Sequence, residues 1–266
     1  MSGFVELSNE DYHSYEGISK SGLDKIARSP AHYRYSEQRE STRAMVIGTA
    51  IHAAILEPER FDLEYVITEC KARTESAYKK AKAVHGDELT LTAQEGKKVS
   101  NMREAVENNF EAMQYLRAPG KAEASAIATD PETGITIRAR FDWITDSGVA
   151  VDVKKTQDLR KFGRSVFDYR YHVQEAMYSY VYKLVTGNDL QAFYFLAVEE
   201  EAPHSNQMFL LDDLAREMGE FYFRRDLRTY ARCKDSGIWP HPALDNIIDM
   251  PNWAVAQYEN ELEVIL

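Results

Sequence analysis

Apolar residues in the first half of the chain recur three or four positions apart, which is the spacing of an amphipathic helix. Ser21, followed by Asp24, fits a helix N-cap, and Thr92 with Glu95 forms a capping-box pattern at a second helix start. Pro30 and Pro58 close the first two stretches. We therefore predict helices over residues 21–29, 46–56 and 92 to about 117. Residues 69–90 instead combine lysines and arginines with few apolar positions, which predicts a mobile basic loop.

The period changes to two in the centre of the chain. From Ile135 to Asp142 apolar and polar residues alternate, as in a strand with one buried face. Turn sequences on either side join it to its neighbours, so we predict three antiparallel strands near 123–128, 135–142 and 149–153. A helix over 169–186 closed by Gly187, a buried strand over 190–198 and a long helix over 211–234 follow. This order predicts an α/β fold in which helices flank a mixed β-sheet.

Length and composition indicate one domain, which we place over residues 1–266. With 44% hydrophobic residues, 266 residues can bury a full core. No stretch approaches the roughly 20 apolar residues of a membrane span, and the N-terminus lacks the order of a signal peptide, so we expect a cytoplasmic protein. Cys70 and Cys233 are too few for a cysteine-based metal site, so oxygen and nitrogen must hold any metal.

The formal net charge of -11 argues against a general nucleic-acid coat, because affinity for phosphates comes from lysine and arginine. The charge is unevenly distributed, however. Between Arg138 and Arg170, eight basic residues stand against five acidic ones, a local charge of +3. A basic segment around carboxylates fits an enzyme that handles a polyanion at one site, although chance clustering explains the count equally well.

Two carboxylates and an amine are predicted to meet on the central hairpin. Residues two apart on a strand project from one face, so Asp152 and Lys154 point the same way. The turn at 146–148 returns the chain so that Asp142 comes within reach of Asp152. Mg²⁺ is usually held by one or two carboxylates together with phosphate oxygens of the substrate. Such an ion polarises a phosphodiester, while Lys154 orients the attacking water or neutralises charge.

Asp142 followed by Asp152-Val153-Lys154 resembles the D-x(n)-(D/E)-x-K motif of the restriction-endonuclease-like, or PD-(D/E)XK, nuclease superfamily. Phe141 stands where the superfamily usually has proline. The resemblance implies the restriction-endonuclease-like version of the predicted fold. It also implies a metal bound by Asp142 and Asp152, with Lys154 assisting catalysis.

The flanking segments resemble the RecB-like branch of this superfamily. The stretch from Gly48 to His52 is similar to the helix that supplies a histidine metal ligand there. Gln174 and Tyr178 match the Q-x-x-x-Y motif, which implies that they shape the catalytic site, and spacing of four puts both on one helical face. Residues 18–30 resemble the N-terminal segment, with Ser29 in place of the cysteine of iron-sulfur relatives, so we expect no iron-sulfur cluster.

The order of motifs from Tyr15 to Trp253 resembles the C-terminal nuclease domain of the RecE (exodeoxyribonuclease VIII) family. This resemblance implies an ATP-independent 5'-to-3' exonuclease that digests linear double-stranded DNA and leaves 3' single-stranded tails. It implies Mg²⁺ as cofactor, with Mn²⁺ as a substitute, and a ring-shaped homotetramer. It further implies a RecT-like single-strand annealing protein as partner and a phage or prophage origin in a bacterial host. We expect no association with a membrane.

Each candidate residue also has a structural interpretation. His52 fits a core histidine, Asp142 fits a cross-strand partner of Arg138 or Arg140, and Lys154 fits a counter-ion of Asp152. Gln174 and Tyr178 fit polar positions on a packed helix. The remaining candidates are Glu123, a further metal ligand or a solvated strand residue, and Lys155, Arg160, Lys161 and Arg164, which contact DNA phosphates or serve solubility.

Two other functions fit the same sequence. A catalytically silent module could keep the fold and bind DNA ends or dock an annealing protein, although such proteins usually lose the lysine or a carboxylate. A restriction-type endonuclease would use the same site and differ in cutting closed circular DNA.

Overall fold

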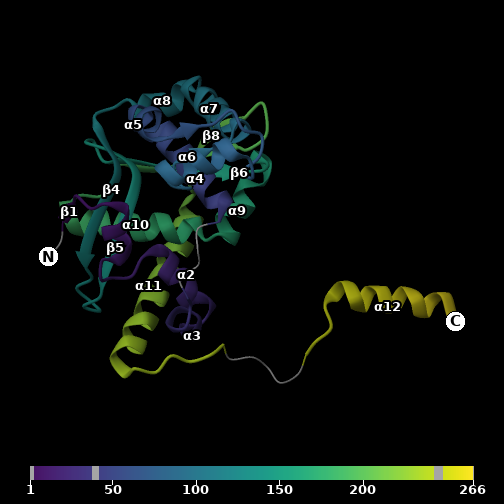
Figure 1. The fold of residues 1–266 in the computed structure, drawn as a ribbon. Coiled ribbons are helices and arrows are strands. Elements are labelled where there is room, and N and C mark those ends of the chain that lie inside the picture. The colour runs from purple at the N-terminus through teal and green to yellow at the C-terminus, as the bar shows by residue number, and fades with distance from the viewer. Residues whose placement is uncertain (1–2, 38–41, 243–247, 266) are drawn as a thin grey trace.

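The computed structural model describes residues 3–37, 42–242 and 248–265. A six-stranded sheet in the order β1-β4-β5-β6-β7-β8 forms its centre (Figure 1). β4, β5 and β6 are successive antiparallel strands, β6 pairs with β7 in parallel, and β7 pairs with β8 antiparallel, so the sheet is mixed as predicted. The strands are β1 (Gly3–Val5), β4 (Gly120–Thr129), β5 (Thr136–Thr145), β6 (Val149–Thr156), β7 (Ala192–Glu199) and β8 (Asn206–Phe209), with β2 (Val66–Ile67) and β3 (Thr90–Leu91) in a separate parallel pair.

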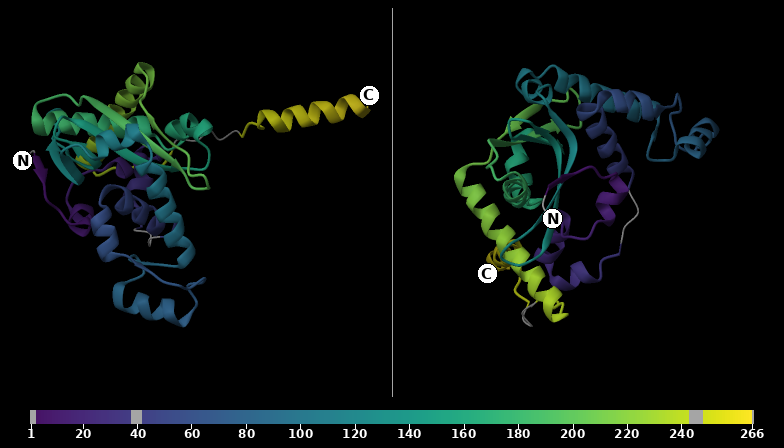
Figure 2. Two further views of the ribbon diagram at one scale, coloured as in Figure 1. Left: turned by 90° about the horizontal axis from the view of Figure 1, so that it is seen from above. Right: turned by 90° about the vertical axis from the view of Figure 1, so that its left-hand side faces the viewer.

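Helices cover both faces of the sheet. α10 and α11 lie on one face with α2, and α4, α5, α7 and α8 lie on the other (Figure 1). α12 lies apart from the other helices and strands (Figures 1 and 2). The helices are α1 (Asn9–Ser14), α2 (Lys20–Arg28), α3 (Pro30–Arg34), α4 (Arg43–Leu56), α5 (Pro58–Glu64), α6 (Ser76–His85), α7 (Ala93–Glu107), α8 (Phe110–Leu116), α9 (Phe162–Asp168), α10 (Tyr171–Thr186), α11 (Asp213–Ser236) and α12 (Asn252–Ile265), with a 3₁₀ turn η1 (Leu159–Lys161) before α9. No helix in the described ranges has both the length and the apolar character needed to cross a bilayer.

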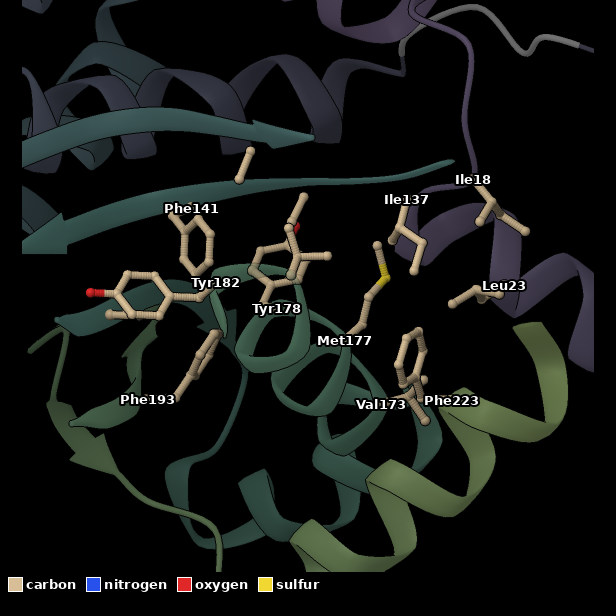
Figure 3. Packing of buried hydrophobic residues seen from close by; sticks show 14 of the residues in the cluster. Ile18, Leu23, Ile137, Phe141, Val173, Met177, Tyr178, Tyr182, Phe193 and Phe223 are labelled. Atoms are coloured by element: carbon tan, nitrogen blue, oxygen red, sulfur yellow. The ribbon is translucent and has the colours of Figure 1, made fainter. Parts of the chain in front are cut away.

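The sheet separates two hydrophobic clusters. On the α10 side, Phe141 and Ile137 of β5 pack against Met177 and Tyr178 of α10 (Figure 3). On the α4 side, Val151 and Val153 of β6 pack with residues of α4 and α7. Because both faces of β6 are covered, its side chains are buried except for Lys154 and Lys155 near its C-terminal end, which are partly exposed.

Several predicted boundaries differ from the structure. Ser19, not Ser21, is the N-cap of α2, and its hydroxyl accepts a hydrogen bond from Gly22 N. The predicted capping box of Thr92 and Glu95 is confirmed at the start of α7. The long helix predicted to reach Arg117 breaks after α7, because Asn109 caps a new helix, α8.

The basic segment 69–90 contains a helix, α6, and the first residue of β3, and so is not the loop that we predicted. Together with β2, it projects from the body (Figure 2). Tyr78 is buried, and its hydroxyl donates to Thr90 O at 3.0 Å. Arg73 and Lys82 both pair with Asp87. One buried aromatic residue and local ion pairs therefore order a segment whose apolar content is low.

Close packing of α10 on α11 predicts that Gly219→Ala lowers stability. A Cβ at Gly219 would lie 2.2 Å from His172 O, so the helices would have to separate. Overpacking of this kind costs about 1–3 kcal/mol, and each kcal/mol lowers the Tm by about 2–4 °C in a chain of this size. Gly163→Ala is the control, since nothing lies within 4 Å of the added atom. Equal melting of the two variants would contradict this packing.

Glu175 lies on the same interface between α10 and α11. We predict that Glu175→Gln raises the free energy of unfolding, and that the increase depends on pH. Burial raises the pKa of Glu175 to about 7, and the ion pair with Arg216 offsets only part of this rise. Because 4.5 is the ordinary value, the folded state holds an extra proton between pH 4.5 and 7, and stability falls as pH rises through that window. The glutamine removes this penalty of at most about 3 kcal/mol.

Thermal unfolding of Glu175→Gln and the parent at pH 5 and pH 8 checks this prediction. The variant should gain more over the parent at pH 8 than at pH 5. An equal gain at both pH values would show that Glu175 is charged in the fold throughout the range.

Candidate active site

The candidate site lies where β5 and β6 diverge. The two strands pair next to their turn, through Trp143 with Val151 and Ile144 with Ala150. One step further along this register, Asp142 faces Asp152. Here the Asp142 carboxylate accepts a hydrogen bond from Val153 N at 2.8 Å. The Asp142 side chain thus takes the place of a backbone carbonyl of β5 as the acceptor for Val153 N. As a result, β5 and β6 separate at the two predicted carboxylates, Asp142 and Asp152.

Glu123 extends this pair into a row of three acids across three strands. The pairing of Ala122 with Trp143 and of Ala124 with Phe141 places Glu123 beside Asp142. Glu123 has a φ of 48°, a left-handed conformation that costs a non-glycine residue about 1 kcal/mol or more. At this point the side chains two residues apart on each strand no longer face the same side of the sheet. Ala124 and Phe141 belong to the α10-side cluster, whereas Ala122 and Trp143 pack with the α4-side cluster.

His52 completes a group that could hold a metal ion. Located on α4, it places Nδ1 3.3 Å from Asp142 Oδ2. One ligand atom each from His52, Glu123 and Asp142 lie within 4.8 Å of one another. Asp152 Oδ2, which is buried nearby, contacts Lys154 Nζ. Carboxylate oxygens with one imidazole, and the buried Asp152 carboxylate nearby, fit a divalent cation.

Asp152 is buried, with 2% of its surface exposed, and two neighbours fix its carboxylate. Gln174 Nε2, from α10, donates to Asp152 Oδ1 at 2.5 Å, while Lys154 forms an ion pair with Oδ2. Lys154 Nζ also lies 4.8 Å from the centroid of the Tyr171 ring, which restricts the ammonium on its other side. The predicted carboxylate, amine and amide are therefore in direct contact.

Burial and like charges shift the pKa values at this site. Burial, helped by the nearby charge of Asp142, raises the pKa of Asp152 to about 6, although Lys154 opposes the shift. Burial and Asp142 likewise raise the pKa of Glu123. For Lys154, burial acts to lower the pKa, but Asp152 and Asp142 outweigh it and leave the pKa above its ordinary value. A cation bound among these acids would offset their mutual repulsion.

Tyr178 lies beneath the site. Its ring packs edge-on against Phe141, with centroids 5.1 Å apart, and burial raises the pKa of its hydroxyl well above the ordinary value (Figure 3). A hydrogen bond links it to the backbone of Arg140, two residues before Asp142. Tyr178 thus supports the strand that holds the acid, whereas Gln174 contacts an acid directly.

The four predicted DNA contacts lie outside this cluster. Lys155 forms an ion pair with Glu200 at 2.6 Å and faces α4, where its Cε would meet a Cβ at Gly48. Arg160 and Lys161 pair with Asp158, and Arg164 pairs with Asp168. Arg160, Lys161 and Arg164 lie on η1 and α9, and their side chains are highly exposed. They are therefore accessible to the phosphates of a bound DNA.

Sequence reasoning did not assign roles to two residues that adjoin the site, Lys20 and Tyr171. Lys20 Nζ lies 5.7 Å from the Tyr171 ring centroid, on the ring that also contacts Lys154. Burial lowers the pKa of Lys20, partly against the attraction of Asp24. Lys20 falls in the segment resembling the RecB-like N-terminal motif, which was the available signal. Nothing in the spacing distinguished Tyr171 from the other tyrosines of α10.

The chain resembles a protein of known structure in its fold. No curated protein matches the chain. Among solved structures, a protein from Eubacterium rectale described as a "putative exonuclease" superposes with a TM-score of 0.62 at 16% identity, covering 93% of this chain and 96% of its own. A second, SSO0001, has a TM-score of 0.30 at 10% identity over 79% of this chain and 84% of its own.

The first likeness shows that the fold is shared. The family model described as "PDDEXK-like domain of unknown function (DUF3799)" matches residues 19–245, which include the whole candidate site. The chain therefore belongs to this PDDEXK-like family and has its mixed α/β nuclease fold.

Proposed function

We propose that the protein is a Mg²⁺-dependent, ATP-independent exonuclease of the RecE type. In this proposal it degrades one strand of linear double-stranded DNA from 5' to 3' and leaves 3' single-stranded tails for recombination. The main support is the contact of Lys154 and Gln174 with Asp152, next to the cluster of His52, Glu123 and Asp142. A catalytically silent module is disfavoured because Asp142, Asp152 and Lys154 are all retained and Lys154 contacts Asp152.

Each residue of the site has a separate role in the proposed reaction. Asp142, Asp152 and His52, with Glu123 as a further ligand, would hold the cation, which supplies charge neutralisation on the phosphodiester and acidifies a water. Lys154 stands next to Asp152 and orients the attacking water or neutralises charge in the transition state. Gln174 fixes the rotation of the Asp152 carboxylate, and Tyr178 supports β5 beneath Asp142. Mn²⁺ should substitute, because it favours the same oxygen ligands.

End-labelled linear duplex tests this function. With Mg²⁺ and no ATP, we expect mononucleotide release from 5'-labelled strands first, and no product in the presence of chelator. Covalently closed circular DNA should stay intact. Cutting of the circle would instead identify an endonuclease of restriction type, and inertness toward both DNAs would leave a binding module.

The assembly and partners that we propose come from the family resemblance. They are a ring-shaped homotetramer and a RecT-like annealing protein that receives the tail, in the cytoplasm of a bacterium that carries the phage or prophage. The basic residues between Arg138 and Arg170 would line the channel of the ring, since the rest of the chain is acidic. Light scattering of the purified protein tests the oligomer. A structure of the oligomer with this segment facing outward would contradict the channel.

A further inference from the structure

The turn between α9 and α10 places an aromatic side chain in solvent beside the candidate site. Tyr169 is 62% exposed. Its ring centroid lies 5.7 Å from that of Tyr171, with the planes tilted by 31°. The Tyr171 ring in turn lies 4.8 Å from Lys154 Nζ. Two aromatic rings thus lead from the buried ammonium of the site to the surface.

The turn that presents Tyr169 is strained and firmly held. Arg170 has φ 56° and ψ 42°, a left-handed conformation that is unfavourable for a residue with a side chain. Its guanidinium donates to Leu23 O at 3.3 Å and forms ion pairs with Asp24 and Asp226. Lys20 Nζ donates to Tyr169 O at 2.6 Å. Contacts from α2 and α11 therefore fix this turn, and backbone strain of this kind is concentrated at functional sites.

The surroundings of the two rings suit a nucleotide. Lys20 and Lys154 both lie against the Tyr171 ring, so cationic groups stand next to the path from the site to Tyr169. Exposed aromatic residues bind nucleobases by stacking, which tolerates every sequence because every base has a π-face. A single phenol ring matches one base, and in a duplex the neighbouring bases already cover the faces of all but the terminal pair.

We propose that Tyr169 is a stacking platform for an unpaired nucleobase next to the phosphodiester at the reaction centre. The inference rests on the proposed function and deepens it. The nucleotide that enters the site leaves its complementary base and stacks on Tyr169 instead. Consequently, DNA whose end is already unpaired is the preferred substrate, because no base pair has to be opened first.

Fluorescence of a short single-stranded DNA with 2-aminopurine as its terminal base tests the platform in chelator, without cleavage. Stacking on Tyr169 should quench this probe. Tyr169→Ala should abolish quenching and weaken binding about tenfold, since a base-aromatic stack contributes a factor of that order. Tyr169→Phe should preserve both. Phe167→Ala is the matched control, because Phe167 is 58% exposed but stacks on His172 and not on Tyr171.

The platform is overturned if the wild-type protein does not quench the probe, if Tyr169→Ala binds like wild type, or if Phe167→Ala loses as much. A second measurement compares cleavage of blunt linear duplex with duplex that ends in unpaired nucleotides, in Mg²⁺. Wild type should prefer the unpaired end, and Tyr169→Ala should lose that preference. Failure of wild type to cleave either DNA refutes the proposed function, whereas equal preference in the variant refutes the platform.

Discussion

Asp152→Asn should lower kcat for cleavage of linear duplex at least about 10³-fold, while the protein remains folded. Asparagine keeps the size of the side chain and an Oδ1 that can accept the hydrogen bond from Gln174. It removes the negative charge that, with Asp142, would attract the cation. The loss should persist at high Mg²⁺, because an amide oxygen neither matches the carboxylate as a ligand nor balances Lys154.

Asp146→Asn provides the control for this variant. Asp146 is exposed in the turn of the same hairpin, so its replacement removes an equal charge from the same strands without touching the site. It should cleave DNA at the wild-type rate. Circular dichroism checks the fold of both variants. Activity of Asp152→Asn within tenfold of wild type would exclude Asp152 from the reaction centre.

The hairpin with Asp142 and Asp152 was predictable because its determinants are local. Alternation of polar residues defined the strands, and a short turn set the register that brings the two acids opposite each other. The same locality explains why Lys154 and Asp152 were expected on one face. His52 is nearly a hundred residues away in sequence and could be placed only through the family resemblance.

Other parts of the site depend on long-range contacts that no local pattern encodes. Glu123 joins the acids because β4 pairs with β5 in a register that contains a left-handed residue, and alternation alone would not predict that reversal. Lys20 reaches the site because α2 packs against α10. The order of α6 depends on the burial of one residue, Tyr78, within a basic segment. Strand pairing and helix docking therefore decide which of several acids and lysines lie at the centre.

Lys154→Met should lower kcat about 10²- to 10³-fold while the protein still binds DNA. The ammonium is confined between the Asp152 carboxylate and the Tyr171 ring, so no neighbouring cation can take its position. Lys154→Arg should not restore activity, because a planar guanidinium is larger and loses its proton far less readily than an ammonium. Single-turnover cleavage of linear duplex at saturating Mg²⁺ measures the chemical step separately from binding and product release.

Combining this variant with Asp152→Asn separates chemistry from structural pairing. Removing one member of a buried ion pair leaves an uncompensated charge and costs about 3–5 kcal/mol, so each single variant should melt at a lower temperature. The double variant Asp152→Asn/Lys154→Met has no buried charge at this position and should recover much of that loss. Its activity should remain as low as that of Asp152→Asn, because residues that act as a unit are not additive in catalysis. If Lys154 served only to neutralise Asp152, Lys154→Met would cost stability but retain cleavage at temperatures well below its melting point.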